Sequence, residues 1–553
     1  MSNITTTPSK PKAKTVGDPI PQYESLQTVW SKARAILNGQ NSAKAFDNTL
    51  DVYTYKNLLI PFSPKMDHAQ YTFYKAEAEL PGLVGQYAKV LVGGLLRKPP
   101  QFELPKSVPE EASEWLRNNF SAEGNSLIAF LDECLWEELQ TSRCWALVEY
   151  PEVSIEATNM MTKEQRDALS PYAVMVKAEN VINWRKGKVA TSNAMVLTKF
   201  TIRGYREEYT VDNPHHPTLI DTVVDYALDE TGHLIVQRYK RPSDTDQINV
   251  VNGQIQHNFQ VQQNTNWEAD GLPVLPMMHG KRMPFIPAWP LNGSIDAYEP
   301  VLQPLIDREV GLYNKISRRN HLLYGAATYT PYIASDMSDE QFDEAVGAGL
   351  GSWLHLQKGD TCGALDTPTA ALADMEKAIA ATIEEMARMG IRMLSPEGSS
   401  AESGTALEIR NAAQTAQLGL LNTKVSKTIQ SMLKVMIKWK YDVDVEEGDL
   451  QFTLSADFNP TPLGADWMRL VTEWYQGGII PRSVFLQIAK QNDVIPIDYN
   501  DDDGKEEIMA DPLVAQAQDI DSDPEDPTLG ASKKKTKDKA QPKYEETTTI
   551  KEY

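Results

Sequence analysis

The sequence predicts an α+β fold that is mainly helical, and two observations support this. From Tyr23 to about Pro290, short helical patterns alternate with strand-like runs. After Pro290, the chain carries long apolar stripes at helical spacing. With 553 residues the chain is too long for one ordinary hydrophobic core, so we expect two to four structural units.

Composition and charge narrow the class of protein. Hydrophobic residues make up 41% and charged residues 24% of the chain, as in globular proteins, and the net charge is −22. An acidic protein is not expected to bind DNA over its whole surface, because Lys and Arg bind phosphates. The three cysteines form no CxxC motif, so neither a zinc knuckle nor a disulfide framework is predicted, and a reducing compartment fits. The sequence begins without the apolar segment of a signal peptide and has no run of about 18 apolar residues, so no membrane association is expected.

The first half of the chain is predicted to mix helices and strands. Residues 1–20 are polar with Pro and Lys, and we expect them to be disordered. The Gln/Asn-rich stretch 249–264 is expected to form an exposed loop or an irregular hairpin. The expected helices are Tyr23–Asn38, Leu80–Leu96 and Leu127–Leu139, and the expected strands are Cys144–Tyr150, Ala173–Val176 and Leu234–Arg238.

A first long helix is predicted over Ser294–Tyr324. Pro300 and Pro304 lie at or just before its first turns, where proline is tolerated. The helix carries a basic cluster, which is either a solvated face or a positive ring that contacts phosphates or a partner once several copies assemble. The cluster consists of Lys315, Arg318, Arg319 and His321, and the first three form the possible basic ring.

A second long helix, a polar loop and a third helix follow a glycine-containing stretch. Over Ala370–Leu394 the apolar residues are spaced by three or four positions, as on one helix face. After the loop SPEGSSAESG, the third helix starts at Gly404 or Thr405 and extends to Tyr441. Thr405 and Glu408 fit a capping box, which would fix where the loop ends.

The C-terminal part is predicted to hold one strand, a helical hairpin and a tail. The segment QFTLSADF resembles a strand, and Ala465–Tyr475 and Pro481–Gln491 are expected to be two short helices separated by a Gly-Gly pair. Beyond Ile497 the chain is first acidic and then lysine-rich, so we expect it to be disordered.

No motif in the sequence indicates enzymatic chemistry. The phosphate-binding motif GxxxxGK[ST] and the nucleophile motif GxSxG do not occur. His215 and His216 lie between two prolines, which favours a loop over a metal site. The acidic stretch around Gly504 lacks calcium ligands at the first and last positions of a calcium loop. We therefore predict no enzymatic activity, no catalytic residues, no cofactor and no metal.

Three segments of the first half resemble the N-terminal half of tailed-bacteriophage portal proteins, in particular a branch catalogued as a phage domain of unknown function. They are FYKAEAELPGLVGQYAKVLVGGLLRKPPQFELP, GNSLIAFLDECLWEELQTSRCWALVEYP and SPYAVMVKAENVINWR. The order of the later helices also matches, so the resemblance covers about residues 20–510. The sequence departs from the pattern at Tyr87-Ala88-Lys89, and the Gln/Asn-rich loop looks like an insertion.

The resemblance implies a portal-type, ring-forming fold with named parts: a mixed wing domain, a two-helix stem, a small α/β clip and a helical crown. The implied parts are residues 21–293 as wing, 294–324 as stem helix 1, 325–368 as clip, 369–394 as stem helix 2, 395–404 as tunnel loop, 405–441 as a long helix into the wing, 442–464 as a wing strand segment, 465–496 as crown helices, and 497–553 as a tail.

The resemblance also implies a function. Portal proteins form a dodecameric ring at one capsid vertex, with an axial channel through which double-stranded DNA passes without sequence specificity. The implied partners are further copies of the chain, the terminase large subunit, the major capsid protein, and head-completion, adaptor or tail proteins. The implied location is the portal vertex of the virion, with assembly in the host cytoplasm. The alternatives are an adaptor or scaffold that joins capsid to tail without a channel, and an enzyme within residues 21–293.

In such a ring the polar loop would project into the channel from every copy. Glycine and serine would let it adapt to a DNA helix whose symmetry does not match the ring, and its carboxylates would repel phosphates and so prevent adhesion. The expected channel residues are Glu397, Ser399, Ser400, Glu402, Ser403 and Thr405. A simple connector between two helices is the alternative for the same segment.

Deleting Ser395–Gly404 is expected to leave assembly of the protein intact but to impair DNA packaging or retention, because the polar loop lies between two packing helices. The measurement is the yield of DNA-filled particles from cells that carry the deletion. Normal packaging by the deletion would contradict the assignment of the loop.

Overall fold

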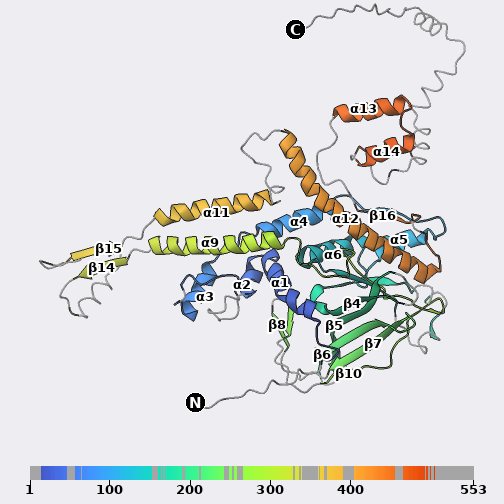
Figure 1. Ribbon diagram of the computed structural model, residues 1–553, viewed down its shortest axis with the longest axis horizontal. Coiled ribbons are helices and arrows are strands. Elements are labelled where there is room, and N and C mark those ends of the chain that lie inside the picture. Colours follow the sequence, from blue (N-terminus) through green and yellow to red (C-terminus); the bar gives the residue numbers. More distant parts are fainter. Residues whose placement is uncertain are drawn as a thin grey trace, which may run out of the picture. The chain divides into compact units, whose positions relative to one another are not determined.

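The chain folds into two units, residues 1–458 and 459–553, which we describe separately from a computed structural model (Figure 1). The structure describes residues 14–46, 57–63, 65–151, 160–162, 165, 169–189, 194–210, 213–241, 248–251, 254–257, 266–327, 330–334, 338, 359, 361–365, 370–389, 404–446, 448–454, 465–491, 494–495, 499 and 504.

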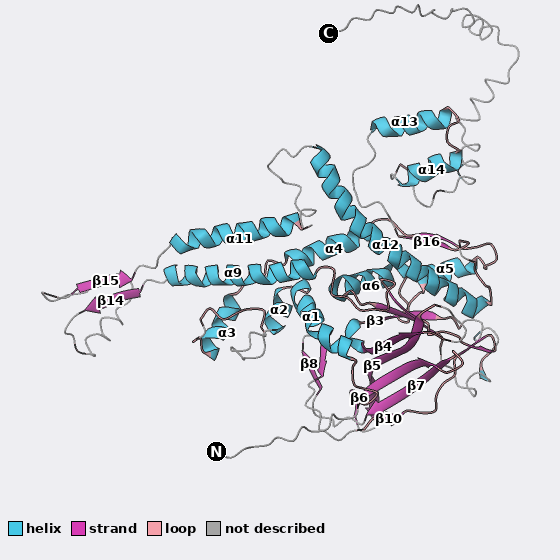
Figure 2. Cartoon of the chain, in the orientation of Figure 1, coloured by secondary structure: helices cyan, strands magenta, loops and turns pink. Residues whose placement is uncertain are grey.

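Helices and sheets are both present, as the sequence predicts, and helices predominate among the described residues (Figure 2). The helices of the first unit are α1 Pro21–Leu37, α2 Gln40–Phe46, α3 His68–Glu77, α4 Leu83–Leu95, α5 Glu111–Asn118, α6 Leu127–Thr141, the 3-10 helix η1 Ala178–Asn180, α9 Gln303–Ala327, α11 Ala370–Arg388 and α12 Gly404–Tyr441. The described part of the second unit contains α13 Ala465–Gln476 and α14 Arg482–Gln491.

The strands that the structure describes pair with one another antiparallel. The largest sheet has the order β10-β7-β6-β5-β4, and a second sheet has the order β13-β2-β3. The strands of these two sheets are β2 Trp145–Glu149, β3 Tyr172–Val176, β4 Val181–Gly187, β5 Val196–Thr210, β6 Asn213–Leu228, β7 Leu234–Arg241, β10 Glu268–Ala269 and β13 Ala288–Pro290. The two-stranded pairs are β1 Gln101–Glu103 with β16 Gln451–Thr453, β8 Ile248–Val251 with β9 Gln254–His257, β11 Met277–Met278 with β12 Lys281–Arg282, and β14 Thr330–Ala334 with β15 Thr361–Leu365.

Two hydrophobic cores hold the first unit together. One lies among the helices α4, α6, α9 and α12, and the other lies against the five-stranded sheet and contains Trp30 of α1, Trp145 and Phe200. The side chain of Arg34 on α1 joins them, since it donates hydrogen bonds to the carboxylates of both Glu137 on α6 and Glu179 on η1. An arginine that pairs with two partly buried carboxylates holds these three elements in fixed register.

The expectation that residues 1–20 are disordered is wrong for residues 14–20. Gly17 lies so close to Trp267 that an added Cβ would be 2.2 Å from the indole Nε1. The carboxylate of Asp18 accepts hydrogen bonds from the backbone N–H and the hydroxyl of Thr15, and the N–H of Ile20 donates to the carbonyl of Ile182. The polar composition of this segment gives no sign of its contact with Trp267. That contact depends on Gly17 alone, because only a residue without a side chain can approach the indole ring so closely. Residues 1–13 lie outside the described residues.

The first long helix begins at Gln303, and the expected start at Ser294 is wrong. The guanidinium of Arg143 donates to the carbonyl oxygens of Ser294, Ile295 and Asp296 at 2.9, 2.7 and 3.3 Å. These carbonyls would have to accept N–H groups of the following turn if the segment were helical. The side chain of Arg143, which is distant in sequence, therefore keeps residues 294–296 out of the helix that the local pattern predicts.

The region around His215 and His216 is strand, and the expectation of a loop is wrong. Both histidines belong to β6, which pairs with β5 across a two-residue connection. The register of this pair shifts between Glu208 and Thr210, close to the end of the hairpin. Prolines are tolerated at strand ends and bulges, so the neighbouring Pro214 and Pro217 do not prevent the strand. The Gln/Asn-rich stretch contains the hairpin of β8 and β9, which is the second of its two expected forms.

The later helices lie close to their expected ranges. α11 starts at Ala370, and residues 390–394 of the expected helix lie outside the described residues. α12 covers Gly404–Tyr441. The expectation that Thr405 caps this helix is wrong, because an N-cap residue precedes the helix with extended backbone and Thr405 is already helical. The expected tail 497–553 lies outside the described residues except for Tyr499 and Gly504.

Replacing Arg143 with Lys is expected to lower the free energy of unfolding by about 2–4 kcal/mol. A lysine ammonium cannot satisfy three separated carbonyls, and it cannot stack on the indole rings of Trp145 and Trp184 as the guanidinium does. Denaturant unfolding of the full chain measures the change. The matched control is Arg185→Lys on the exposed surface of β4, which should change stability by less than about 0.5 kcal/mol. Equal stabilities of the two variants would contradict the role of Arg143.

Candidate functional site

The candidate site is the antiparallel helix pair α9–α11 together with the junction that fixes α9 to the rest of the first unit. Arg308 of α9 pairs with Glu385 of α11 at 2.8 Å, and Lys315 donates to the hydroxyl of Thr382 at 2.5 Å. From Arg308 to Lys315 the residue number on α9 increases, while from Glu385 to Thr382 the number of the contacted residue on α11 decreases, so the helices run antiparallel. Figures 1 and 2 show them side by side. Strands β14 and β15 lie between the two helices in the chain and pair from Thr330–Leu365 to Ala334–Thr361.

The first half of α9 is held inside the helical core. Its residues Leu305, Ile306, Leu312 and Tyr313 are buried. The fully buried carboxylate of Glu309 accepts hydrogen bonds from the backbone N–H groups of Leu83 and Val84 at 2.7 and 2.8 Å. Glu309 thereby caps the start of α4, whose own N-cap residue, Gly82, has no side chain to do so. Burial raises the pKa of Glu309, against the effect of these hydrogen bonds.

A buried amide fixes the next turn of α9. Asn314 donates to the carbonyl of Leu58 at 2.7 Å and accepts from the N–H of Ile60 at 2.8 Å. The same amide nitrogen also donates to the carbonyl of Val310 one turn earlier on α9. Buried polar side chains with all these bonds made give a unique position to the elements that they join. The segment before α3 is therefore locked onto α9.

The junction ahead of α9 is built around the corner between α6 and β2. Ser142, at the end of α6, has φ of 50°, and its hydroxyl accepts the N–H of Val301 at 3.0 Å. The carbonyl of Ser142 accepts the side-chain amide of Asn292 at 2.8 Å. The next residue, Arg143, is completely buried, and its Cζ lies 4.5 Å from the ring centre of Trp145 and 4.4 Å from that of Trp184. The corner thus holds both ends of the segment that leads into α9.

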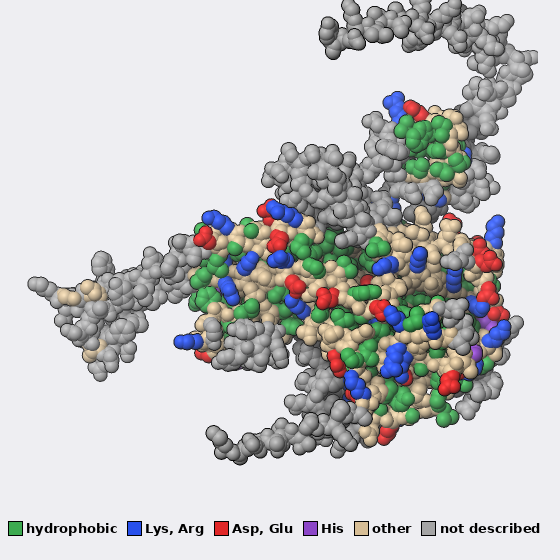
Figure 3. Space-filling model, viewed as in Figure 1, with side chains coloured by type: hydrophobic (Ala, Val, Ile, Leu, Met, Phe, Trp, Pro, Cys, Tyr) green, Lys and Arg blue, Asp and Glu red, His purple; other side chains and the backbone are tan. Residues whose placement is uncertain are grey.

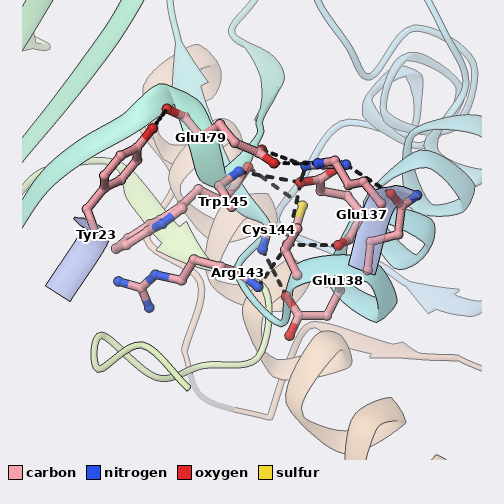
Figure 4. A network of polar contacts seen from close by, with 11 residues as sticks. Tyr23, Glu137, Glu138, Arg143, Cys144, Trp145 and Glu179 are labelled. Carbon is pink, nitrogen blue, oxygen red and sulfur yellow. Dashed lines mark hydrogen bonds and ion pairs between the residues drawn. The ribbon is translucent and has the colours of Figure 1, made fainter. Parts of the chain in front are cut away.

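A carboxyl group completes this junction. Glu138 is buried, accepts the N–H of Cys144 at 3.0 Å and lies near Arg143 (Figure 4). Burial raises the pKa of Glu138 to about 8, while the hydrogen bond from Cys144 and the charge of Arg143 act in the opposite direction. Burial also lowers the pKa of Arg143 to about 9. The charged forms of both groups are therefore disfavoured inside the junction.

The C-terminal half of α12 packs against the same region. Its apolar residues Val425, Ile429 and Met432 are buried in the helical core. The hydroxyl of Thr428 donates to the carbonyls of Pro290 and Leu291 at 3.4 and 3.3 Å, just before the junction segment. The amide of Gln430 donates to the carbonyl of Phe452 on β16 at 2.8 Å. The junction is therefore enclosed by α6, β2 and α12.

The expected channel residues lie mostly outside the described part of the chain. Glu397, Ser399, Ser400, Glu402 and Ser403 lie outside the described residues, between α11 and α12 in the chain. Thr405 lies in the first turn of α12.

The basic cluster lies in the second half of α9, and its members have different neighbours. Lys315 faces α11 through Thr382, whereas Arg318 is exposed and lies near Tyr74 of α3. Burial raises the pKa of Tyr74 to about 12, and the guanidinium of Arg318 opposes this shift. Arg319 is half-buried and donates to the amide oxygen of Asn320 at 3.0 Å. Each of these cations therefore has contacts within its own chain.

Sequence reasoning did not identify the residues of the junction. Glu138 and Glu309 belong to helices and Arg143 to a short connection, and charged residues in such segments are normally at the surface. Their partners are backbone groups more than 100 residues away for Arg143 and Glu309. No local pattern reveals such pairings, and only the side-chain type of Arg, which can bond several carbonyls at once, gives a hint.

No three His, Cys, Asp or Glu side chains in the described part of the chain lie together as metal ligands would. No described helix is long and apolar enough to cross a membrane.

Comparison with known proteins identifies one family and several solved structures. A family described as a domain of unknown function (DUF4055) matches residues 302–440, which extend from the start of α9 almost to the end of α12. A chain from the virion of a native gene transfer agent particle is 12% identical with a TM-score of 0.36, and the match covers 72% of this chain and 88% of that chain. A chain from the neck of an empty gene transfer agent particle, computed with C6 symmetry, is 10% identical with a TM-score of 0.34, covering 71% and 85%.

No curated protein matches the sequence. The two structural similarities are too low to carry an argument about fold or function. The family match covers α9, α11 and nearly all of α12, so it includes the helix pair of the candidate site but not the junction ahead of it.

Replacing Glu138 with Gln is expected to reduce the pH dependence of stability between pH 5 and 8. The folded-state pKa of Glu138 is raised to about 8, so the unfolded chain releases this proton at lower pH than the folded chain. The wild type therefore loses stability as pH rises through this window, whereas glutamine keeps an oxygen for the N–H of Cys144 and cannot ionise. Denaturant unfolding at several pH values measures the difference. If the stability of the Gln variant relative to the wild type does not increase from pH 5 to pH 8, the raised pKa of Glu138 is contradicted.

Proposed function

We propose that the protein is a portal protein, a ring-forming structural subunit of a tailed-phage-type particle through which double-stranded DNA enters and leaves the capsid. The observation that carries this proposal is the order of elements over residues 302–440. A helix anchored in the core leads to a pair of antiparallel strands, and a second helix returns antiparallel to the first. A polar segment follows, and a 38-residue helix ends in the core. This is the order implied by the resemblance to portal proteins.

In this proposal α9 and α11 are the stem, and β14 and β15 belong to the clip. The first half of α9 is fixed by Glu309, Asn314 and the Arg143 junction, whereas the outer half contacts only a few elements among the described residues. A helix pair that is anchored at one end can carry its hairpin away from the core. The clip would then be accessible to the terminase large subunit during packaging and to adaptor or tail proteins later.

The polar segment between α11 and α12 is proposed to line the DNA channel. Glu397 and Glu402 would place two carboxylates from each copy near the DNA, and like charges at short range repel phosphates. Because the chain contacts DNA in this way without reading bases, passage would not depend on sequence. The role is structural, and we propose no reaction for the protein.

Electron microscopy of the purified full chain is the test. We expect closed rings of about twelve copies with an axial hole that admits duplex DNA, as a repeated head-to-tail contact requires. A chain truncated after Asp511 is the control, and it should form the same rings because its missing residues are too polar to contribute a core. Monomers, or closed oligomers without a hole, would overturn the proposal and favour an adaptor between capsid and tail.

A further inference from the structure

A row of lysines, which we call the lysine stripe, follows the outer side of α12 and consists of Lys424, Lys427 and Lys434. Lys424 and Lys427 are exposed and Lys434 is half-buried. At about 100° per residue, the three side chains lie within about 80° of one another around the helix and over a length of about 15 Å. The opposite side of the helix carries the apolar residues that are buried in the helical core. The stripe is therefore the solvent side of an amphipathic helix.

No negative charge accompanies the stripe on its own helix. Residues 411–441 contain five lysines and no carboxylate, although 76 of the chain's 553 residues are Asp or Glu. The next lysine on this side, Lys438, pairs with Asp444, whereas no carboxylate in the described part of the chain pairs with a lysine of the stripe. Figure 3 shows Lys and Arg side chains over the part of the first unit in which Figure 1 places this helix. The stripe is thus a local concentration of positive charge on an acidic protein.

The neighbouring elements add little negative charge. Strand β16 packs against α12, and its exposed side chains Gln451 and Thr453 are uncharged. The partner of this strand, β1, adds one exposed carboxylate, Glu103. Helix α4 also contacts α12, and residues 80–102, which include α4, contain three cations and no carboxylate. The surroundings therefore do not cancel the positive charge of the stripe.

The composition of the stripe favours nucleic acid over protein as its partner. Interfaces between proteins are depleted in lysine and are enriched in aromatic residues and methionine. From Lys424 to Lys434, no described residue of α12 is both apolar and exposed. Phosphate groups, in contrast, are bound chiefly by Lys and Arg, and the affinity comes from the charge of these side chains. A lysine row without apolar neighbours therefore fits a phosphate backbone.

We propose that the lysine stripe of α12 binds the phosphate backbone of double-stranded DNA. This inference rests on the proposed function, which brings DNA to the protein, and adds a surface that attracts DNA to a segment that repels it. Gly404 begins α12, and Lys424 lies about 30 Å further along the helix, so the stripe and the proposed channel segment contact different stretches of DNA. Because lysines bind phosphates as point charges, the contact would not depend on base sequence.

A stripe variant that combines Lys424→Gln, Lys427→Gln and Lys434→Gln tests the contact. Fluorescence anisotropy with a short labelled duplex measures binding by the purified full chain between about 50 and 200 mM salt. We expect the variant to bind about tenfold or more weakly at the lower salt concentration. We also expect the slope of log affinity against log salt to fall by about two to three, because three phosphate contacts are lost. A second duplex of different sequence should show the same loss.

The matched control combines Lys65→Gln, Lys106→Gln and Lys188→Gln, which removes the same charge from three exposed sites outside α12. The control should bind the duplex as the wild type does, and circular dichroism checks the fold of both variants. An equal loss in both variants, or a wild type that does not bind the duplex, would overturn the proposed contact. A stripe variant that binds DNA normally but no longer assembles would overturn it in favour of an acidic surface of another copy.

Electron microscopy of the same samples separates this inference from the proposed function. Rings whose DNA binding is unchanged in the stripe variant would overturn the stripe and leave the portal proposal intact. A chain that forms no rings but loses DNA binding with the stripe would overturn the portal proposal and leave the stripe as a DNA-binding surface.

Discussion

The hydrogen bonds from the Arg143 guanidinium to three successive carbonyls are the constraint on which the arrangement of the first unit depends. They hold residues 294–296 out of the helical conformation that their sequence allows and so decide where α9 begins. The same guanidinium lies between Trp145 of β2 and Trp184 of β4 and thereby ties both sheets to this point. Removing one partner of a buried charged group costs about 3–5 kcal/mol, which is a large part of the 5–15 kcal/mol that typically stabilises a domain. The direction of α9 is therefore set by the core and not by the helix itself.

The other buried polar groups extend this constraint along α9. Glu309 fixes α9 to the start of α4, and Asn314 fixes it to the segment before α3, each through backbone groups. Thr428 of α12 reaches the backbone immediately ahead of the junction. Because these bonds use main-chain partners, they restrain the position of whole elements, and they would keep that position when surface side chains vary. In the proposed portal, such rigidity at the base would keep the orientation of the helix pair while partners act on its far end.

Periodicity was enough to predict the helices α9, α11 and α12, because their apolar stripes extend over many turns. It failed where distant groups override local preference. The start of α9 depends on Arg143, about 150 residues earlier, and the order of residues 14–20 depends on the close approach of Gly17 to Trp267. The histidines of β6 were misassigned because their flanking prolines favour loops, although strand ends and bulges accept them. For the candidate site, the sequence supplied the helices and the polar segment, but the buried residues of the junction have no local signature.

The placement of the cations on α9 bears on how a channel could transport DNA. Lys315 bonds to Thr382, Arg318 lies near Tyr74 and Arg319 is half-buried, so all three are already engaged with neighbours in their own chain. Freeing them to bind phosphates would cost these contacts, and strong phosphate binding would slow passage. In the proposed ring, the segment between α11 and α12 would face the DNA with Glu397 and Glu402 and would repel it.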